Sequence, residues 1–550
     1  MAIRGMARGW FAGLVALVIA PAAPASADWH QARSAHFVVY ADDKPERLRA
    51  FATKLERFDR ALRVLFSKDD DGASSSRRLT VYVVDDTGDV AKLAGKGQSG
   101  TAGFYLPRAT GAVAFVPRQG VGEGQLGLSA QTVLLHEYAH HFMISSWPNL
   151  AFPAWYTEGF AEFTATALFN KDGGITIGAA PQYRARDILL PSMSMKQIIA
   201  ADINALPLDK KTQIYGRGWL LTHYLMVSSE RRSLLSAYVK ALNSGKSTIE
   251  AAAVFGDLGA LDKQLNRYAA NRLSGFVLEP AALGIGPVEV TPLSPGAAAV
   301  MPALLRSTRG VNRATAPAVY ALADKLAAPF PKDPVVQAVL AEAAHDAEQF
   351  DAAKAAADRA IAADPRNFAA LIYQGRTAMA VAVRNGVRDP ARWTAVRRSF
   401  LAANKIDLEN AEALFLFYES FLAAGQTPTK NAQDALAYAY ELAPFDPGLR
   451  MTAAGMFLTQ GNAAIARLAL GPVAFSPHGG GLAALASATI DVLDKNGPKA
   501  ALAFMTKGRS SSPLENGGQN GATAPHDKNK DTNTKPDGAE NAKAGSPASD

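Results

Sequence analysis

Cysteine is absent from the 550-residue sequence. Its absence excludes disulfide bonds and thiolate metal sites, so any bound metal must be held by nitrogen and oxygen ligands. No apolar stretch after residue 27 approaches the roughly 20 residues that span a bilayer, so the mature chain is expected to have no membrane span. The formal net charge is only +7, and an excess this small predicts no nucleic-acid partner.

The first 27 residues are expected to form a cleaved signal peptide. Arg4 and Arg8 precede an apolar run of eleven residues from Trp10 to Ala20, and "ASA" at residues 25–27 supplies the small side chains that a signal peptidase requires. A membrane anchor is the alternative, although the run is short for a span. The sequence therefore predicts an exported chain, periplasmic or extracellular in a bacterium, whose mature form begins at residue 28.

The pattern of residues 28–275 predicts an α+β domain. Strands are expected over residues 35–41 and 78–86, separated by a helix around residues 46–66. Two short strands, 103–107 and 111–118, are expected to follow as a hairpin. Predominantly helical segments then continue to about residue 275.

The C-terminal half is expected to be helical. Residues 276–297 are rich in proline and glycine, which predicts a linker between domains. Residues 298–507 are alanine-rich with helical periodicity, and residues 334–365 show tetratricopeptide spacing, although Gln337 and Ala344 stand where large aromatics are typical. Degenerate repeats that offer a surface to a protein partner are expected, with a generic helical bundle as the alternative.

The last residues, 508–550, have a composition that cannot bury enough apolar surface to order itself. They predict a disordered tail.

Three of the nine histidines lie within six positions of the segment "LLHEYAHHFM". Apolar residues recur there at three- and four-residue intervals, Ser129 can cap the start and Pro148 follows the end, which together predict a helix. On this helix His136 and His140 lie one turn apart, so both imidazoles can reach one ion. Glu137 projects beside them. In such an arrangement two histidines ligate zinc and the carboxylate is a general base, with chance occurrence or core packing as the alternative reading of these five residues.

A site built on two imidazoles needs a third protein ligand. A metzincin would place glycine and histidine where Met143 and Ser146 stand, so that route is closed. A second helix, predicted over residues 152–169, offers Glu158 and Glu162 on one face because they are four residues apart. A solvated helix face is the alternative reading of these two glutamates.

Two negative charges four residues apart destabilise a helix, so a positive group is expected close to Glu158 and Glu162. With zinc bound, Glu158 would be the third ligand and Glu162 would accept a hydrogen bond from an imidazole N–H. Gly159 lacks a side chain and is expected to let this helix approach the histidine helix closely.

The two motifs together, "HEYAH" and the later "WYTEGFAEF", resemble the gluzincin metallopeptidases, among them the peptidase-MA-like proteins of bacteria. The resemblance covers roughly residues 30–275 and is strong only across residues 130–165. It implies a zincin-like fold and one Zn2+ per chain, held by His136, His140 and Glu158.

The resemblance also implies Glu137 as the general base. Members of this fold place a tyrosine or histidine several tens of residues later as a donor to the oxyanion, and Tyr215 is the candidate here, with an ordinary packing aromatic as the alternative. Residues 111–118 are expected to be the edge strand that binds an extended peptide, unless they form an interior strand. No Gly-x-Met-Glu-Asn segment is present, so exopeptidase action is not supported.

These observations predict an α+β zincin-like metallopeptidase domain followed by an all-α helical-repeat domain. The expected activity is zinc-dependent endopeptidase hydrolysis of a peptide or protein substrate, through a zinc-bound water and a glutamate base. Two alternatives stay open: a non-catalytic helical-repeat scaffold with a degenerate zincin domain, and a zinc hydrolase of another amide, such as a cell-wall peptide.

Overall fold

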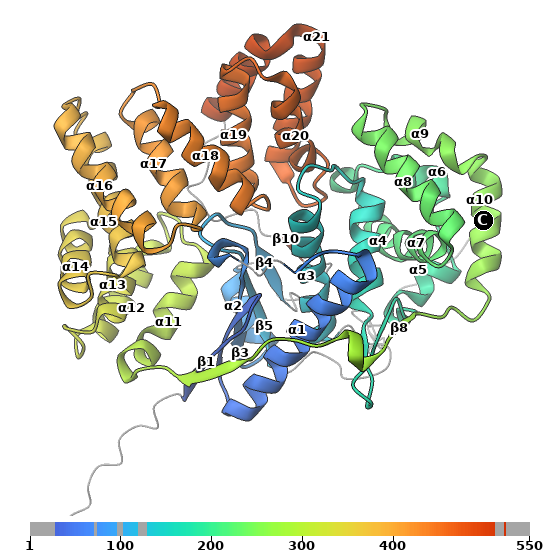
Figure 1. Ribbon diagram of the computed structural model, residues 1–550, viewed down its shortest axis with the longest axis horizontal. Coiled ribbons are helices and arrows are strands. Elements are labelled where there is room, and N and C mark those ends of the chain that lie inside the picture. The colour runs from blue at the N-terminus through green and yellow to red at the C-terminus, as the bar shows by residue number, and fades with distance from the viewer. Residues whose placement is uncertain (1–27, 71–73, 96–102, 119–128, 512–521, 524–550) are drawn as a thin grey trace, which may run out of the picture.

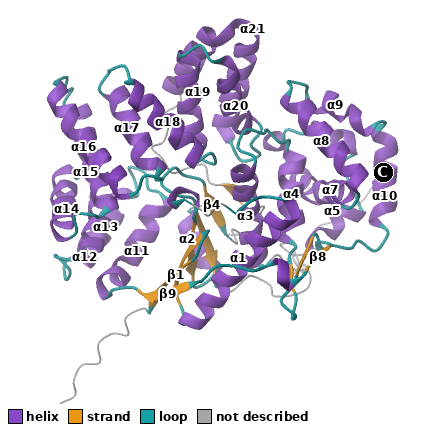
Figure 2. Cartoon of the chain, in the orientation of Figure 1, coloured by secondary structure: helices purple, strands orange, loops and turns teal. Residues whose placement is uncertain are grey.

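The computed structural model describes residues 28–70, 74–95, 103–118, 129–511 and 522–523. The predicted signal peptide and most of the predicted tail lie outside the described residues. Helices predominate, and the strands form a central sheet and a second, smaller one (Figure 2).

The central sheet is mixed and has the strand order β10-β4-β5-β3-β2-β1-β9. Strands β2, β3 and β5 run parallel, and every other neighbouring pair is antiparallel. The predicted strand–helix–strand opening is confirmed, with α1 (Pro45–Phe66) joining β2 to β3. The strands are β1 (Trp29–Arg33), β2 (Phe37–Asp42), β3 (Leu79–Val84), β4 (Phe104–Leu106), β5 (Val113–Pro117), β9 (Glu289–Pro292) and β10 (Ala522–Thr523).

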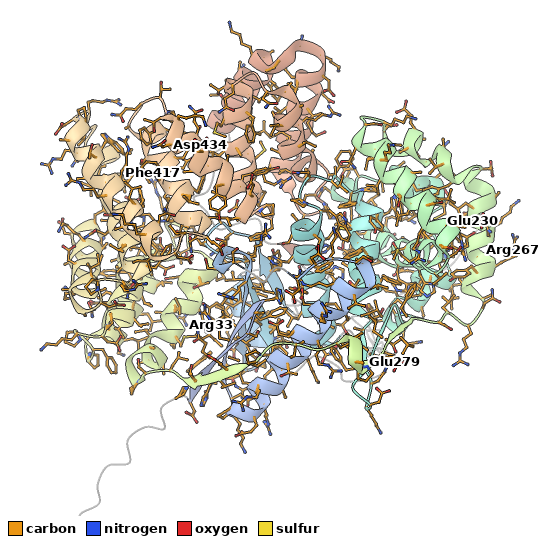
Figure 3. The ribbon with its side chains drawn as sticks, viewed as in Figure 1. Arg33, Glu230, Arg267, Glu279, Phe417 and Asp434 are labelled. Carbon is orange, nitrogen blue, oxygen red and sulfur yellow. The ribbon has the colours of Figure 1, made fainter. Side chains whose placement is uncertain are left out.

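Helices cover both faces of this sheet. Successive strand residues point to opposite sides and therefore pack against different helices. Val81 and Val83 of β3 belong to the apolar cluster of α1 and α3 (Ala130–Ser146). Tyr82 and Val84 belong instead to a cluster with residues of α2 (Thr87–Ala94) and α11 (Pro295–Arg309). Side chains fill the space between the layers (Figure 3).

The predicted hairpin of two short strands is confirmed as β4 and β5, but its expected edge is wrong. Strand β5 pairs with β3 on one side and β4 on the other, so it lies inside the sheet. All five of its residues are buried, and such an uninterrupted apolar run is typical of a strand covered on both faces. Strand β4 lies farther out and pairs on its outer side with β10.

The helices that follow α3 lie on the right in Figure 1, and α4 (Ala154–Ala165) packs against α3. The helix predicted over residues 152–169 ends earlier, at Ala165. The last two residues of the predicted range, Leu168 and Phe169, form strand β6 instead. These elements are α4 (Ala154–Ala165), β6 (Leu168–Phe169), β7 (Ile175–Ile177), α5 (Ala185–Leu189), α6 (Met195–Ala200), α7 (Leu208–Met226), α8 (Ser229–Asn243), α9 (Thr248–Ala251), α10 (Leu258–Ala269) and β8 (Phe276–Leu278).

The segment 276–297, expected to be only a linker, also supplies two strands. Strand β8 pairs with β7 in the smaller sheet, and β9 pairs with β1 in the central sheet. The sequence "EVTP" of β9 contains β-branched residues, which favour extended backbone despite the nearby prolines. The segment is therefore anchored to both sheets while it crosses from one half of the chain to the other.

The C-terminal half is an open stack of helix pairs, which is a helical repeat rather than a closed bundle. The pairs are α11 with α12 (Ala316–Ala327), α13 (Pro334–Asp346) with α14 (Phe350–Ala363), α15 (Phe368–Arg384) with α16 (Pro390–Ile406), α17 (Ala411–Ala423) with α18 (Lys430–Leu442), and α19 (Pro447–Thr459) with α20 (Ala463–Ala474). The first helices of successive pairs pack on one another, α11 on α13, α13 on α15 and α15 on α17. At the last step it is α18 that packs on α19. The stack runs along the left and top of Figure 1.

Capping side chains set the start of several of these pairs. Asp333, Asn367, Asn410 and Asp446 each accept a hydrogen bond from a backbone N–H in the first turn of the following helix. The last helix, α21 (Gly480–Ser511), extends into the segment predicted to be the tail. No helix among the described residues combines the length and hydropathy that a membrane crossing requires.

The last helices pack directly on the N-terminal half. One apolar cluster contains residues of α1, α3, α4 and α7 together with residues of α17–α21. Polar contacts accompany it: Tyr440 donates a hydrogen bond to Asn149 at 3.1 Å, and the backbone N–H of Ala109 donates to Asp446 at 2.6 Å. The two halves therefore share a core near α3.

A half-buried acid in the repeats is expected to make stability depend on pH. Burial, followed by the charge of Asp346, raises the pKa of Glu342 from 4.5 to about 7. The folded state therefore binds the extra proton between these values, and stability falls as pH rises through this window. We expect Glu342→Gln to raise the free energy of unfolding by about 1–2 kcal/mol at pH 8 and to change it little at pH 5.

Urea unfolding at the two pH values measures this difference. Asp324→Asn, at an exposed position on α12, is the control and should show no such pH dependence. An equal effect of Glu342→Gln at both pH values would contradict the assignment.

Candidate metal centre

Helix α3 holds the residues of the histidine motif inside the protein. The predicted cap is confirmed, because the side chain of Ser129 accepts a hydrogen bond from the N–H of Thr132. The helix is buried around most of its circumference, so its polar side chains face other protein groups rather than water. The Nε2 atoms of His136 and His140 lie 3.1 Å apart.

Helix α4 brings Glu158 against this pair. The Oε2 atom of Glu158 lies 3.3 Å from Nε2 of His136 and 3.7 Å from Nε2 of His140. Glu158 is completely buried. The structure thus brings the three sequence-predicted ligands together.

The geometry of these three atoms fits a shared cation. A tetrahedral zinc ion, with bonds of about 2.0–2.1 Å, holds its ligand atoms about 3.3–3.4 Å apart, and the three distances here are 3.1, 3.3 and 3.7 Å. Both oxygens of buried Glu158 face imidazoles, Oε2 those of His136 and His140 and Oε1 that of His478 at 2.9 Å, but none of these contacts has the geometry of a hydrogen bond. A cation at Oε2 would therefore satisfy an oxygen that the protein leaves without a hydrogen bond. Two imidazoles and a carboxylate are ligands that zinc accepts.

Burial and charge together set the protonation of this centre. Burial alone would raise the pKa of Glu158, but the imidazoles of His478, His140 and His136 hold it well below its usual value. Burial lowers the pKa of His140 to about 3, so this ring stays neutral with a lone pair for a metal. Burial raises the pKa of Glu137 to about 7.

Gly159 allows a close approach, but to α7 rather than to the histidine helix. A Cβ atom at this position would lie 2.4 Å from the carbonyl oxygen of Gly218. The prediction was wrong because consecutive helix residues differ by about 100° in direction. When Glu158 faces α3, the next residue faces a different neighbour.

Glu162 lies beside His136 without forming the predicted hydrogen bond. Its Oε1 atom is 3.7 Å from Nδ1 of His136, which is beyond hydrogen-bonding distance. Glu162 accepts hydrogen bonds from Tyr183 at 2.7 Å and from Arg184 at 2.9 Å. Arg184 thus supplies a positive partner that the sequence pattern had assigned to the metal and its ligands.

Tyr215 of α7 lies at the edge of the centre. Its ring centroid is 6.0 Å from that of His136, and the guanidinium of Arg184 lies 4.9 Å from the Tyr215 ring centroid. Burial, followed by the charge of Glu158, raises the pKa of Tyr215 well above its usual value. The phenol therefore stays protonated and is a hydrogen-bond donor.

The sequence reasoning missed His478, in the turn between α20 and α21. Its Nε2 atom lies 2.9 Å from Oε1 of Glu158, and its ring centroid is 5.4 Å from that of His140. The only local signal is a histidine in the turn "PHGG". No spacing rule connects such a turn with a motif in the other half of the chain.

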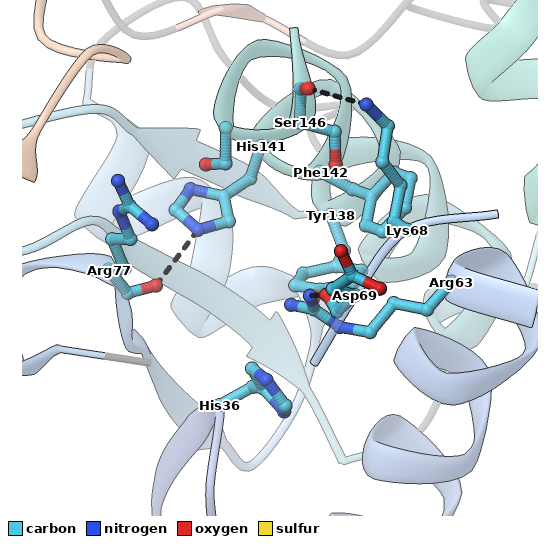
Figure 4. Close-up of a pocket in the computed structure, with 10 residues that line it drawn as sticks. His36, Arg63, Lys68, Asp69, Arg77, Tyr138, His141, Phe142 and Ser146 are labelled. Atoms are coloured by element: carbon cyan, nitrogen blue, oxygen red, sulfur yellow. Dashed lines mark hydrogen bonds between the residues drawn. The ribbon is translucent and has the colours of Figure 1, made fainter. Parts of the chain in front are cut away.

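His141 faces away from the metal centre, on another side of α3. It is buried, with Tyr105 Oη at 2.9 Å from Nδ1 and the carbonyl oxygen of Arg77 at 3.0 Å from Nε2. It lines a cavity of about 220 Å³ with His36 and Lys68 among others (Figure 4). The cavity is therefore separate from the metal centre.

A second cluster of possible ligands lies beside this cavity, formed by His36, Glu56 and Asp59. The oxygens of Asp59 accept hydrogen bonds from Tyr138 and Arg63, both at 2.6 Å. Glu56 is held by the backbone N–H of His36 at 2.7 Å. Because protein donors already satisfy these carboxylates, we assign no metal to this cluster.

Comparisons with known proteins identify only partial structural similarity. No family model and no curated protein match the chain. The solved structures that are similar to part of it include two helical proteins. TTC0263, a thermophilic TPR protein of Thermus thermophilus, is 15% identical over 35% of this chain and 97% of its own length, with a TM-score of 0.30. The MamA RS-1 ArsTM double mutant is 14% identical over 30% of this chain and 88% of its own, with a TM-score of 0.24. The helical repeat is established by the packing of its own helix pairs.

Proposed function

We propose that this chain is an exported zinc metallopeptidase of gluzincin type that hydrolyses internal peptide bonds of a peptide or protein substrate. The observation that carries the proposal is the convergence of two imidazole nitrogens and one carboxylate oxygen from α3 and α4. His136, His140 and Glu158 would hold one zinc ion per chain. The proposal is also supported by the order of the two sequence motifs that supply these ligands.

Glu137 is the proposed general base. It lies on α3 next to His136, and its Oε2 atom accepts no hydrogen bond from the described residues. When bound, zinc acts as a Lewis acid and makes water a stronger nucleophile near neutral pH. Glu137 takes the proton of the attacking water at Oε2 and passes it to the leaving amine.

Tyr215 is the proposed donor to the oxyanion. Its phenol stays protonated because burial raises its pKa, and Arg184 packs over the ring and restricts its motion. A donor fixed in this way stabilises charge that develops in the transition state without a cost of reorganisation.

Strand β4 is the proposed binding edge for an extended substrate. It lies next to α3, and its outer side pairs antiparallel with the two residues of β10. A substrate segment that replaces β10 would form the same main-chain hydrogen bonds, which bind a peptide with little dependence on its side chains.

A non-catalytic binding protein is the competing function. The stacked repeats favour it, and so does the burial of the centre, where Glu137 exposes 3% of its surface and Glu158 none. An assay of cleavage of an unfolded protein and a peptide library, with and without a chelator, separates the two functions. Zinc-dependent cleavage supports the peptidase, whereas a zinc-loaded chain that cleaves neither substrate supports the binding protein.

Removing one histidine tests the ligand set directly. We expect His136→Ala to lose zinc, because two remaining protein ligands hold the ion poorly, whereas the wild-type mature chain should contain about one zinc per chain. His345→Ala, on α13 and bonded to Thr377, is the control and should keep its zinc. Elemental analysis after dialysis gives the stoichiometry, and full occupancy in His136→Ala would refute the assignment.

A further inference from the structure

The helical half of the chain contributes a side chain to the metal centre. Glu158 presents Oε2 to His136 and His140, and its other oxygen, Oε1, lies 2.9 Å from Nε2 of His478. The carboxylate is thus contacted on one oxygen by the N-terminal half and on the other by the repeats.

Packing between the halves fixes the position of this histidine. The guanidinium of Arg450 is buried between α19 and α20 and donates hydrogen bonds to the carbonyls of Ala469 and of Pro148, just after α3. Gly480 follows the turn with a φ of 48°, a conformation that glycine adopts without strain. His478 lies in the turn between α20 and α21, and its side chain is 23% exposed.

The surrounding charges favour a donor at this position. Glu158 and Glu137 are the acidic groups that act on His478, and His136 is a basic neighbour. The 2.9 Å separation of Nε2 and Oε1 lies within hydrogen-bonding distance, and an imidazole N–H can donate to a carboxylate in both the neutral and the protonated ring. The remaining oxygen of Glu158 is left for a cation.

We propose that His478 is a positioning residue for Glu158, and that the helical repeats complete the metal centre in this way. The inference rests on the proposed function, and it assigns the repeats a role inside the site in addition to any partner they bind. Partners that hold the free oxygen of a ligating carboxylate fix its orientation, and their loss typically lowers metal affinity about 10- to 100-fold.

Zinc affinity of the full mature chain, measured by competition with a chromophoric chelator, tests the proposal. We expect His478→Ala to bind zinc about 10- to 100-fold more weakly than the wild type, and His478→Gln, which keeps an N–H donor, to recover part of the loss. Ile465→Ala, exposed on α20 of the same helix pair, should bind zinc as the wild type does. The thermal midpoint of the metal-free protein should be similar in all four proteins.

The outcomes separate this inference from the proposed function. A wild-type chain that binds no zinc overturns both. A wild-type chain that binds zinc, with equal affinity in His478→Ala, overturns the positioning role alone. The positioning role is also overturned if His478→Ala binds zinc more weakly, has a lower thermal midpoint in its metal-free form, and His478→Gln recovers none of the affinity. His478 would then act only on folding. Faster cleavage by His478→Ala at unchanged zinc affinity would show that His478 blocks access of the substrate to the centre, and it would also overturn the proposal.

Discussion

Replacing Glu137 with glutamine is expected to lower peptide hydrolysis by about 100- to 10,000-fold, the usual contribution of a general base. The amide has nearly the same shape as the carboxylate but cannot accept the proton of water. Zinc should stay bound at about one per chain, because Glu137 is not among the three converging ligands. The kcat/KM for a fluorogenic peptide, with the zinc content of the same sample, measures both effects.

Glu230→Gln is a matched control, since Glu230 is exposed on α8 and projects from the right side of the molecule (Figure 3). This variant should cleave as the wild type does. Turnover retained in Glu137→Gln would remove Glu137 from the role of base. Loss of zinc in Glu137→Gln would show that it takes part in holding the metal.

The second large effect is expected from the smallest change, Gly159→Ala. The added Cβ would lie 2.4 Å from the oxygen and 2.5 Å from the carbon of the Gly218 carbonyl. Backbone atoms cannot rotate away, so α4 and α7 must separate. We expect a loss of more than about 3 kcal/mol in the free energy of unfolding, at the upper end of overpacking effects, and weaker zinc binding because Glu158 moves with its neighbour.

Gly471→Ala provides the comparison for this prediction. Gly471 also lies within a helix, α20, but its added Cβ would meet only the Cβ of Ala151, at an ordinary 3.6 Å. Alanine favours a helix over glycine by about 1 kcal/mol, so this variant should be as stable as the wild type or more so. Equal stability of the two variants in urea unfolding would show that α4 and α7 separate without cost.

The candidate metal centre was predictable from the sequence to the extent that its ligands lie close together along the chain. His136 and His140 share one helix turn, so their spacing alone places both rings on one side. Glu158 comes from the next helix of the chain, and the apolar residues around it indicated that it would be buried. The structure brings these three residues together where the motifs predicted.

The remaining features depend on contacts that no local pattern encodes. The interior position of β5 follows from its pairing with β3, which comes from a separate part of the chain. The neighbour of Gly159 is set by the packing of α4 on α7. His478 reaches Glu158 only because the repeats fold back over α3, and this tertiary arrangement has no signature in the residues around His478.

The apolar cluster that joins α17–α21 to α1, α3 and α4 has a consequence for how the molecule can be divided. A cut after residue 297 would leave on each fragment a wide hydrophobic face that water now never reaches, and such faces promote aggregation. The apolar clusters of α11–α17 would stay with the C-terminal fragment, but the cluster that its last helices share with α3 would be split. For the same reason, exchanging these repeats for those of another protein would require redesigning the whole apolar interface between them and α3.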